Sequence, residues 1–330
     1  MGEGIIVTGV KMLLFDLDET LLASDKKIPK GALRVLREYR EAGVRIGVST
    51  SRGAGNTAQY VRQLHPDVII ASGGAQLLID GRTEFASVVE AAKIRSLIRR
   101  AQSIAGEEIL ITADAADGSY YLNFTPPDDD LARSFRRGRK ITFRCFRKDA
   151  LKVCLEIPDE AKAKQVIAEF PELDSIRFSD GYWYKFTNRG ITKEHTIAIM
   201  CERLGISPAD ITAFGDDLAD IGMLRLCGRG IAMGNAQDEV KRAADEVIGT
   251  NNDRGVEIFL RTERVRAMEE LFDRAKAGKA SPSERAALEN YLNNGFLGDY
   301  EADEAGLLPA DLKRGVLSQD ALYDYLSEEG

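Results

Sequence analysis

Histidine is scarce in this chain of 330 residues, and the cysteines are few and widely spaced. The two histidines, His65 and His195, are too few for a metal site built from three imidazoles and leave little material for histidine-based catalysis. The four cysteines include no CxxC pair, which disfavours a zinc knuckle and a dense disulfide framework. We therefore expect any chemistry to be carboxylate chemistry.

Long apolar runs are also missing. No uncharged stretch approaches the roughly 20 residues that a membrane helix needs. The N-terminal segment MGEGIIVTGV has no basic start followed by a long apolar region. We therefore expect a protein without a membrane span that works in the cytoplasm. The sequence also lacks GxxxxGK[ST], so a P-loop kinase has no support.

The sequence also has no excess of positive charge. The chain has 45 basic and 53 acidic residues, a balance of −8, which disfavours a protein that coats nucleic acid. Residues 262–330 hold 8 basic and 15 acidic residues, so −7 of that balance lies in the tail. The exception is residues 133–148, with eight positive charges and no acid. This run is either a solvated face or a surface that helps bind an anionic substrate.

Short apolar runs alternate with helical segments from residue 11 to about residue 80. The run KMLLFDLD is followed by a helix ending near Ala42, then by VRIGVST, a helix near 56–64 and DVIIAS. The same alternation resumes near residue 188 and ends with a helix near 253–260. This order predicts an α/β fold with a Rossmann-like parallel sheet, in which chemistry collects at the carboxyl ends of the strands.

The segments between and after these two parts have a different character. Residues 83–187 mix two helices, near 88–104 and 159–170, with strand-like pieces that include ITFRCF, which predicts an α+β insert with a largely antiparallel sheet. The tail reads as three helical segments, near 263–277, 283–292 and 319–328. We predict a core of residues 1–82 and 188–261, an inserted cap of residues 83–187, and a helical C-terminal extension of residues 262–330.

Two acids leave the first apolar strand, at Asp16 and Asp18. Residues two apart in a strand face the same side, so these carboxylates are expected to share one pocket. Such a pair can transfer protons, bind a hard cation or supply a nucleophile. An isolated DxD can also be a pair of solvated loop acids.

A second acidic run, GDDLAD at 215–220, follows the predicted strand DITAF. It can be an acidic helix N-terminus favoured by the helix dipole. Two acid clusters at the ends of parallel strands can instead converge on one cation. The acids of this run are therefore candidates to bind a cation together with those of the first strand.

Two further segments point to an anion. Ser49–Arg52 supplies hydroxyls and a guanidinium at a strand end, although it could simply cap the next helix. Lys193 stands at a helix start, an unfavourable place for a cation given the helix dipole. A bound anion would explain that position.

Six short motifs in order carry a family resemblance: DLDET (16–20), STSR (49–52), GITKE (190–194), GDDLAD (215–220), MGNA (233–236) and NNDRGV (251–256). Through them the chain resembles the haloacid dehalogenase superfamily, in its Cof-like phosphatase subgroup with a large type II cap. The match spans residues 11–261. The chain departs from the usual pattern at Glu19, where Gly is commonest, at Ala219, where Asn is usual, and at Gly73, where Asn often stands.

The resemblance implies a Mg²⁺-dependent phosphatase that hydrolyses a small phosphorylated metabolite, such as a sugar phosphate or a phosphorylated cofactor, through an aspartyl-phosphate. Asp16 corresponds to the nucleophile and Asp18 to the general acid/base, whose backbone carbonyl would also ligate Mg²⁺. Thr50 corresponds to the hydroxyl that holds the phosphoryl oxygens, and Lys193 to the lysine between nucleophile and phosphate.

The resemblance also implies the remaining site residues. Asp16, Asp18, Asp216 and Asp220 would form the metal site, with Asp217 as a secondary candidate because Ala219 stands where Asn is usual. Ser51, Arg52 and Asn235 join Thr50 and Lys193 as expected substrate-binding residues.

Two other functions stay open at this point. One is a phosphotransferase or mutase of the same family, and the other is a non-catalytic module that senses phosphate or Mg²⁺. The tail resembles a small helical domain of unknown function. It could bind a protein partner, self-associate or simply pack against the core.

Overall fold

The core is an eight-stranded sheet in a computed structural model that describes residues 10–126, 138–178, 181–294 and 299. The strand order is β14-β13-β12-β1-β2-β3-β4-β5. Neighbours from β14 to β3 are parallel, and β4 and β5 add an antiparallel edge. The strands are β1 (Met12–Phe15), β2 (Arg45–Ser49), β3 (Val68–Ala71), β4 (Gln76–Ile79), β5 (Arg82–Ala86), β12 (Ile211–Gly215), β13 (Arg229–Ala232) and β14 (Glu246–Val247). The predicted Rossmann-like core is confirmed.

Helices cover both faces of this sheet because its central strands are apolar on both sides. In β1, Leu13 and Phe15 pack with one group of helices: α1 (Lys30–Glu41), α2 (Ala54–Leu64) and α8 (Gly255–Lys276). Met12 and Leu14 pack with the opposite group: α5 (Lys193–Leu204), α6 (Ile221–Leu226) and α7 (Asp238–Ala243). The loops at the strand ends are thereby held between two packed layers.

The cap is built on a second, six-stranded sheet, ordered β10-β11-β9-β6-β7-β8. Its strands are β6 (Ile111–Ala115), β7 (Tyr120–Leu122), β8 (Arg139–Lys140), β9 (Ala150–Glu156), β10 (Leu173–Arg177) and β11 (Trp183–Asn188). All pairs are antiparallel except β7 with β8. Two helices, α3 (Ala91–Ala105) and α4 (Glu160–Ala168), pack on one face around a separate apolar core. The predicted α+β insert is confirmed.

One predicted strand of the cap, ITFRCF, is wrong. Phe143–Cys145 form a short 3₁₀ turn instead. The rings of Phe143 and Phe146 lie 5.3 Å apart between centroids, and both are buried. A 3₁₀ turn brings residues three apart to the same side, whereas a strand would place them on opposite faces. Burial of both rings therefore favours the turn.

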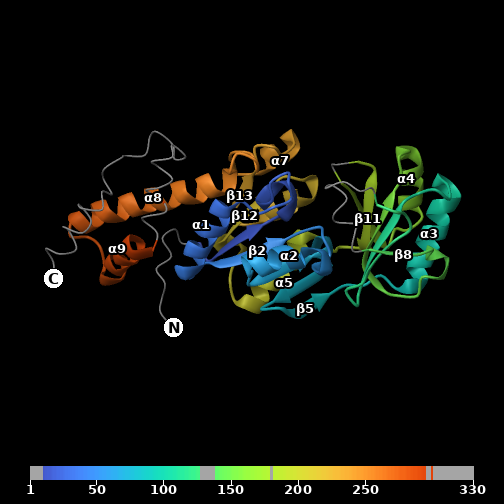
Figure 1. Cartoon of the computed structure of the whole chain (residues 1–330), viewed down its shortest axis with the longest axis horizontal. Helices are drawn as coiled ribbons and strands as arrows, with labels where there is room; N and C mark the ends of the chain where they lie inside the picture. The colour runs from blue at the N-terminus through green and yellow to red at the C-terminus, as the bar shows by residue number, and fades with distance from the viewer. Residues whose placement is uncertain (1–9, 127–137, 179–180, 295–298, 300–330) are drawn as a thin grey trace.

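The three parts follow one another along the long axis of the molecule, with α8 and α9 (Pro282–Asn294) at one end, the core sheet in the middle and the cap at the other end (Figure 1). The hairpin strand β5 still belongs to the core sheet. The domain limits given by the sequence stay a prediction. Among the described residues, no helix has the length and apolar character needed to cross a membrane.

The C-terminal part begins within a helix. The sequence suggests separate helices near 253–260 and 263–277, but α8 is a single helix, Gly255–Lys276. This correction has a simple reason: the joining residues FLRTER contain neither Gly nor Pro, so nothing interrupts the helix. The next helix, α9, matches the expected segment 283–292. The segment 319–328 lies outside the described residues.

A buried ionic network joins this part to the core. Asp299 accepts hydrogen bonds from Arg261 (2.9 Å), from Arg264 (2.5 and 2.8 Å) and from the Tyr291 hydroxyl (3.0 Å). Arg264 also donates to Glu38 of α1 at 2.8 Å. All five residues have little solvent-exposed side chain, so each charge depends on its partners.

Replacing Asp299 should test this network. The Asp299→Ala variant leaves the two buried guanidinium groups of Arg261 and Arg264 short of negative charge, so we expect a loss of about 3–5 kcal/mol in the free energy of unfolding. Chemical denaturation of the full chain measures it. The control Glu169→Ala breaks the exposed pair with Arg100 and should barely change stability. Equal effects of the two variants would contradict the assignment.

Candidate active site at the carboxyl ends of the strands

Three adjacent parallel strands deliver the first polar residues of the site. Phe15 of β1 is in register with Phe214 of β12, and the Asp16 N–H donates to the Phe214 carbonyl at 2.9 Å. Asp16 and Asp216 therefore leave neighbouring strands at the same edge of the sheet. Thr50 follows β2 on the other side of β1, and its N–H donates to the Ile70 carbonyl of β3.

Lys193, the first residue of α5, joins the two acidic segments. Its Nζ donates to Asp16 Oδ1 and to Asp220 Oδ1, both at 2.6 Å. All three residues are buried. Burial alone would lower the pKa of the Lys193 ammonium, but the charges of Asp16 and Asp220 outweigh it and raise that pKa. The lysine is therefore held as a cation between two carboxylates.

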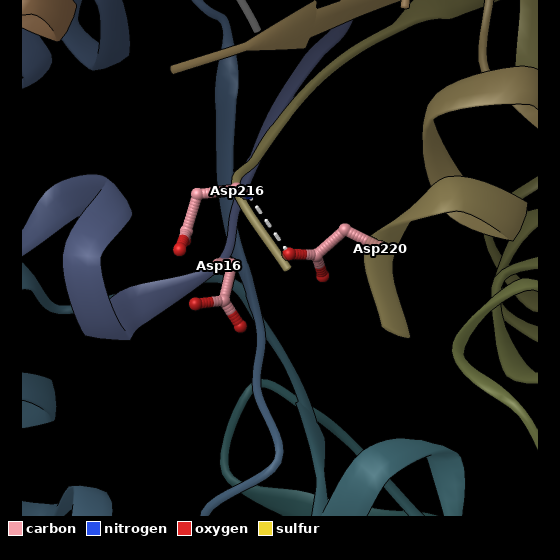
Figure 2. A group of neighbouring side chains, drawn as sticks. All are labelled: Asp16, Asp216 and Asp220. Carbon is pink, nitrogen blue, oxygen red and sulfur yellow. Dashed lines mark hydrogen bonds between the residues drawn. The ribbon is translucent and has the colours of Figure 1, made fainter. Parts of the chain in front are cut away.

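Asp16, Asp216 and Asp220 form one carboxylate cluster, with an oxygen from each lying within 4.8 Å of the others. Figure 2 shows the three side chains around a common space, with the Asp216 N–H bonded to the Asp220 carboxylate. Burial, aided by the charges of Asp220 and Asp216 and opposed by Lys193, raises the pKa of Asp16 well above its ordinary value. Burial also raises the pKa of Asp216 to about 7.

The donor set of this cluster fits a hard divalent cation. Three carboxylates share one lysine, and burial together with the repulsion between the carboxylates raises the pKa values of Asp16 and Asp216. Oxygen ligands from carboxylates are those that Mg²⁺ and Ca²⁺ prefer. The geometry brings together three of the residues that the sequence suggested as metal ligands.

Asp18 points to other partners. Its carboxylate accepts two hydrogen bonds from Arg52, each 2.6 Å, and lies 3.3 Å from Lys26 Nζ. Burial alone would raise the pKa of the Asp18 carboxyl, but the hydrogen bonds and charges of Arg52 and Lys26 outweigh it and lower that pKa. The side chains of Asp18 and Asp16 thus have different partners, because the chain turns directly after Asp16. That the two acids of DLD share one pocket stays a prediction.

The turn owes its shape to Glu19, which has φ 57° and ψ 8°. This left-handed conformation favours glycine, the residue commonest here in the family that the chain resembles. In this chain the Glu19 carboxylate accepts hydrogen bonds from Lys26 (2.7 Å), Ser24 (3.1 Å) and Asn251 (2.9 Å). These hydrogen bonds stabilise a conformation that glycine would adopt without strain.

Asn235, the expected substrate-binding residue of MGNA, also serves this turn. Its amide donates to the Glu19 carbonyl at 2.8 Å, and its side-chain oxygen accepts from the Asn251 N–H at 3.0 Å. The described contacts thus give Asn235 a supporting role beside the site. Its role in binding substrate stays a prediction.

The secondary metal candidate, Asp217, lies outside the three-carboxylate cluster. It is the N-cap of the turn Leu218–Asp220, and its Oδ1 accepts from the Ala219 N–H at 3.0 Å. The second oxygen of Asp220 accepts from the N–H groups of Asp216 and Asp217, each at 3.1 Å. The backbone thus orients Asp220 even though Ala219 stands where Asn is usual.

Thr20 is a site residue that the sequence analysis missed. Its hydroxyl donates to Asp216 Oδ1 at 2.6 Å. It is buried, and it belongs to the same short turn that carries Asp18 and Glu19. Its place inside the DLDET motif was the available signal, four residues after Asp16. His195 is exposed, and its ring packs near Phe85 outside the carboxylate cluster.

The cap contributes three side chains that no motif announced. Lys152 of β9 donates to the Ser51 carbonyl, and Lys185 of β11 donates to the Gly73 carbonyl at 3.2 Å. Asp114 of β6 accepts from the Ser72 hydroxyl at 3.2 Å. All three are buried and reach loops of the core. The signal in the sequence is alternation, because each is a polar residue between apolar ones in a strand.

The expected basic surface is only partly within the described residues. Of the run 133–148, Arg139 lines a cavity of about 240 Å³ between the start of α2 and the β6–β7 turn. Lys148 forms a hydrogen bond with Asp117 at the exposed side of the cap. Residues 133–137 lie outside the described residues. A contact between this run and a substrate stays a prediction.

The fold and this site define the chain as a capped α/β protein with a carboxylate-rich centre. Residues 13–260 match the family of haloacid dehalogenase-like hydrolases, and residues 261–330 match a domain of unknown function. The chain therefore belongs to the haloacid dehalogenase-like hydrolases, as the motifs predicted.

Curated relatives over the same region carry phosphatase names. The chain is 27% identical to a phosphoglycolate phosphatase of Methanopyrus kandleri, with 76% of this chain and 95% of the relative covered. It is 26% identical to the putative phosphatase YkrA of Bacillus subtilis, with 74% and 95% covered. The family and these relatives place the chain among phosphoric monoester hydrolases.

A solved structure supports the fold. The subclass IIB sugar phosphatase BT4131 superposes with a TM-score of 0.65 at 22% identity, and the match covers 75% of this chain and 96% of that one. At that identity the likeness shows the architecture, including the inserted cap.

The Thr20 hydrogen bond should be measurable in stability. We expect Thr20→Val, which keeps the shape and removes the hydroxyl, to lower the free energy of unfolding by about 1–3 kcal/mol, since Asp216 loses a partner. Thr20→Ser keeps the hydroxyl and should lose less. Denaturant titration of both variants measures the difference, and a Val variant as stable as the Ser variant would contradict the role.

Proposed function

We propose that the protein is a Mg²⁺-dependent phosphatase that hydrolyses a small phosphorylated metabolite through an aspartyl-phosphate on Asp16. One observation carries the proposal: the Asp16 carboxylate is fixed by Lys193 at the end of β1 and faces two further carboxylates. The phosphatase names of the relatives support the same reaction class.

In the proposed site, Asp16, Asp216 and Asp220 would hold Mg²⁺, with the Asp18 carbonyl as the further ligand that the resemblance implies. When bound, the cation offsets the negative charge of the carboxylates and of the phosphoryl group. Thr20 and the N–H groups at the start of the turn Leu218–Asp220 keep Asp216 and Asp220 in position.

The phosphoryl group would bind between Asp16, Thr50 and Lys193. The lysine ammonium and the threonine hydroxyl can each donate to phosphoryl oxygens where charge collects in the transition state. Ser51 and Arg52 follow in the same loop. One oxygen of Asp16 then attacks phosphorus in line, and the bond from phosphorus to the ester oxygen breaks.

Asp18 is proposed to give a proton to the departing ester oxygen and to take one from the water that later attacks the phosphorus of the aspartyl-phosphate. Phosphate is released and Asp16 is regenerated. In the structure Asp18 is paired with Arg52, which keeps it ionised. The proposed acid role therefore requires this pair to open when substrate binds.

Removing the nucleophile tests the reaction. Asp16→Asn should abolish metal-dependent release of phosphate from an aryl phosphate while the melting temperature and circular dichroism stay close to those of the parent. The carboxylate oxygen that attacks phosphorus is replaced by an amide, which is a far weaker nucleophile. Unchanged turnover would sink the assignment, and analysis of products separates hydrolysis from transfer to another acceptor.

Metal binding can be followed without any substrate. Mg²⁺ should raise the melting temperature of the parent chain because it binds the folded state selectively. Asp216→Asn should remove most of that shift, since Asp216 lies in the carboxylate cluster. The matched control, Asp217→Asn, alters the neighbouring carboxylate outside the cluster and should retain the shift. The reverse ranking would make Asp217 the metal ligand.

A further inference from the structure

A buried lysine of the cap lies against the loop that supports the phosphoryl-binding residues. Lys185 has only 2% of its surface exposed, and its Nζ donates to the Gly73 carbonyl at 3.2 Å. The Gly73 N–H in turn donates to the Thr50 carbonyl at 3.0 Å. Lys185 is thus separated from Thr50 by a single residue of the core.

The cap strands place this lysine on the face that meets the core. Lys185 is opposite Cys154 of β9, and Cys154 is opposite Thr112 of β6, so the three lie in one row across the sheet. Lys152 and Asp114 form the next row on the same face. The alternate residues point into the apolar core of the cap. These polar residues therefore form the face of the cap sheet that packs against the loops Ser51–Gly53 and Ser72–Gly74.

The two lysines of this cap face differ in their charged partners. Lys152 lies 3.3 Å from Asp114, which gives that lysine a carboxylate partner. Among the described residues, the salt bridges within 4.0 Å include none to Lys185. Burial, together with the charges of Lys152 and Lys193, lowers the pKa of Lys185 to about 8. A buried ammonium whose only acceptor among the described residues is a carbonyl oxygen is costly in the folded chain.

Gly73 makes room for the ammonium group. A Cβ at this position would lie 2.4 Å from Lys185 Nζ, and the backbone has φ +68°. In the neighbouring turn residue, a Cβ on Gly74 would meet the Thr192 carbonyl at 2.2 Å, next to Lys193. The glycine pair therefore lets a cap cation and the core lysine approach the same loop from two sides.

We propose that Lys185 binds a second anionic group on the substrate, a carboxylate or a phosphate on the leaving-group side of the ester. The inference rests on the proposed phosphatase function. In an in-line displacement the leaving group departs on the side opposite the attacking Asp16 oxygen, away from the floor of the core sheet. Lys152 and Lys185 of the cap reach the Ser51 and Gly73 carbonyls of the core loops, and an anion there would give Lys185 a charged partner, which it has nowhere among the described residues.

A pair of esters that differ in one charged group tests the proposal. We compare 2-phosphoglycolate with 2-hydroxyethyl phosphate, whose leaving group has an uncharged hydroxymethyl group in place of the carboxylate. A third ester, the bisphosphate of ethane-1,2-diol, has a phosphate as its second anionic group. Comparing it with 2-phosphoglycolate shows whether Lys185 prefers a phosphate or a carboxylate. For Lys185→Met we expect kcat/KM to fall about tenfold or more with an anionic ester, mainly through KM, and less than about threefold with the neutral one.

Two further variants separate recognition from packing. Lys185→Arg keeps a positive charge and should recover part of the preference for the anionic ester. Lys164→Met removes an exposed lysine from α4, on the other side of the cap, and should leave the preference unchanged. Melting temperatures establish that all variants are folded. An equal loss with charged and neutral esters would mean that Lys185 only holds the cap to the core, and no loss would exclude both roles.

A binding measurement keeps this result apart from the fate of the phosphatase proposal. Calorimetry with Asp16→Asn and Mg²⁺ gives the affinity for each ester without turnover, with and without Lys185→Met in addition. Tighter binding of an anionic ester that depends on Lys185 supports the inference even if the parent chain hydrolyses nothing. Equal affinity for charged and neutral esters overturns it even if the parent chain is an active phosphatase.

Discussion

The ion pairs of Lys193 with Asp16 and Asp220 are the interaction on which the rest of the site depends. These residues come from three separate stretches of the chain, and burial makes each of their charges costly without a partner. The single ammonium group therefore fixes where β1, α5 and the turn Leu218–Asp220 meet. It leaves the excess negative charge beside Asp216, where a cation fits.

Much of this arrangement could be predicted from the sequence because its determinants are local. A buried strand ending in an acid is readable at Asp16 and at Asp216, and parallel strands bring their carboxyl ends to one edge. The direction of the Asp18 side chain was not readable. It depends on the left-handed turn at Glu19 and on Arg52, which is 34 residues away in the chain.

The cap shows the same limit more clearly. Alternation predicts that Lys152 and Lys185 share a face of a strand, but it does not say whether that face meets solvent, helices or the core. The answer comes from contacts such as that of Lys185 with Gly73, 112 residues apart. The two buried rings of Phe143 and Phe146 likewise decide for a turn over a strand through their packing, which propensity does not register.

The continuity of α8 has a consequence for how this protein can be divided. The two family matches meet between residues 260 and 261, inside a helix of 22 residues that is about 33 Å long. The border between the two matched families thus lies within a continuous helix and not in a linker. Arg261 is the first residue after that border, and it forms ion pairs with Glu257 before the border and with Asp299 after it. A chimaera that exchanged the C-terminal domain at residue 260 would therefore interrupt α8. A junction for such an exchange has to lie outside this helix.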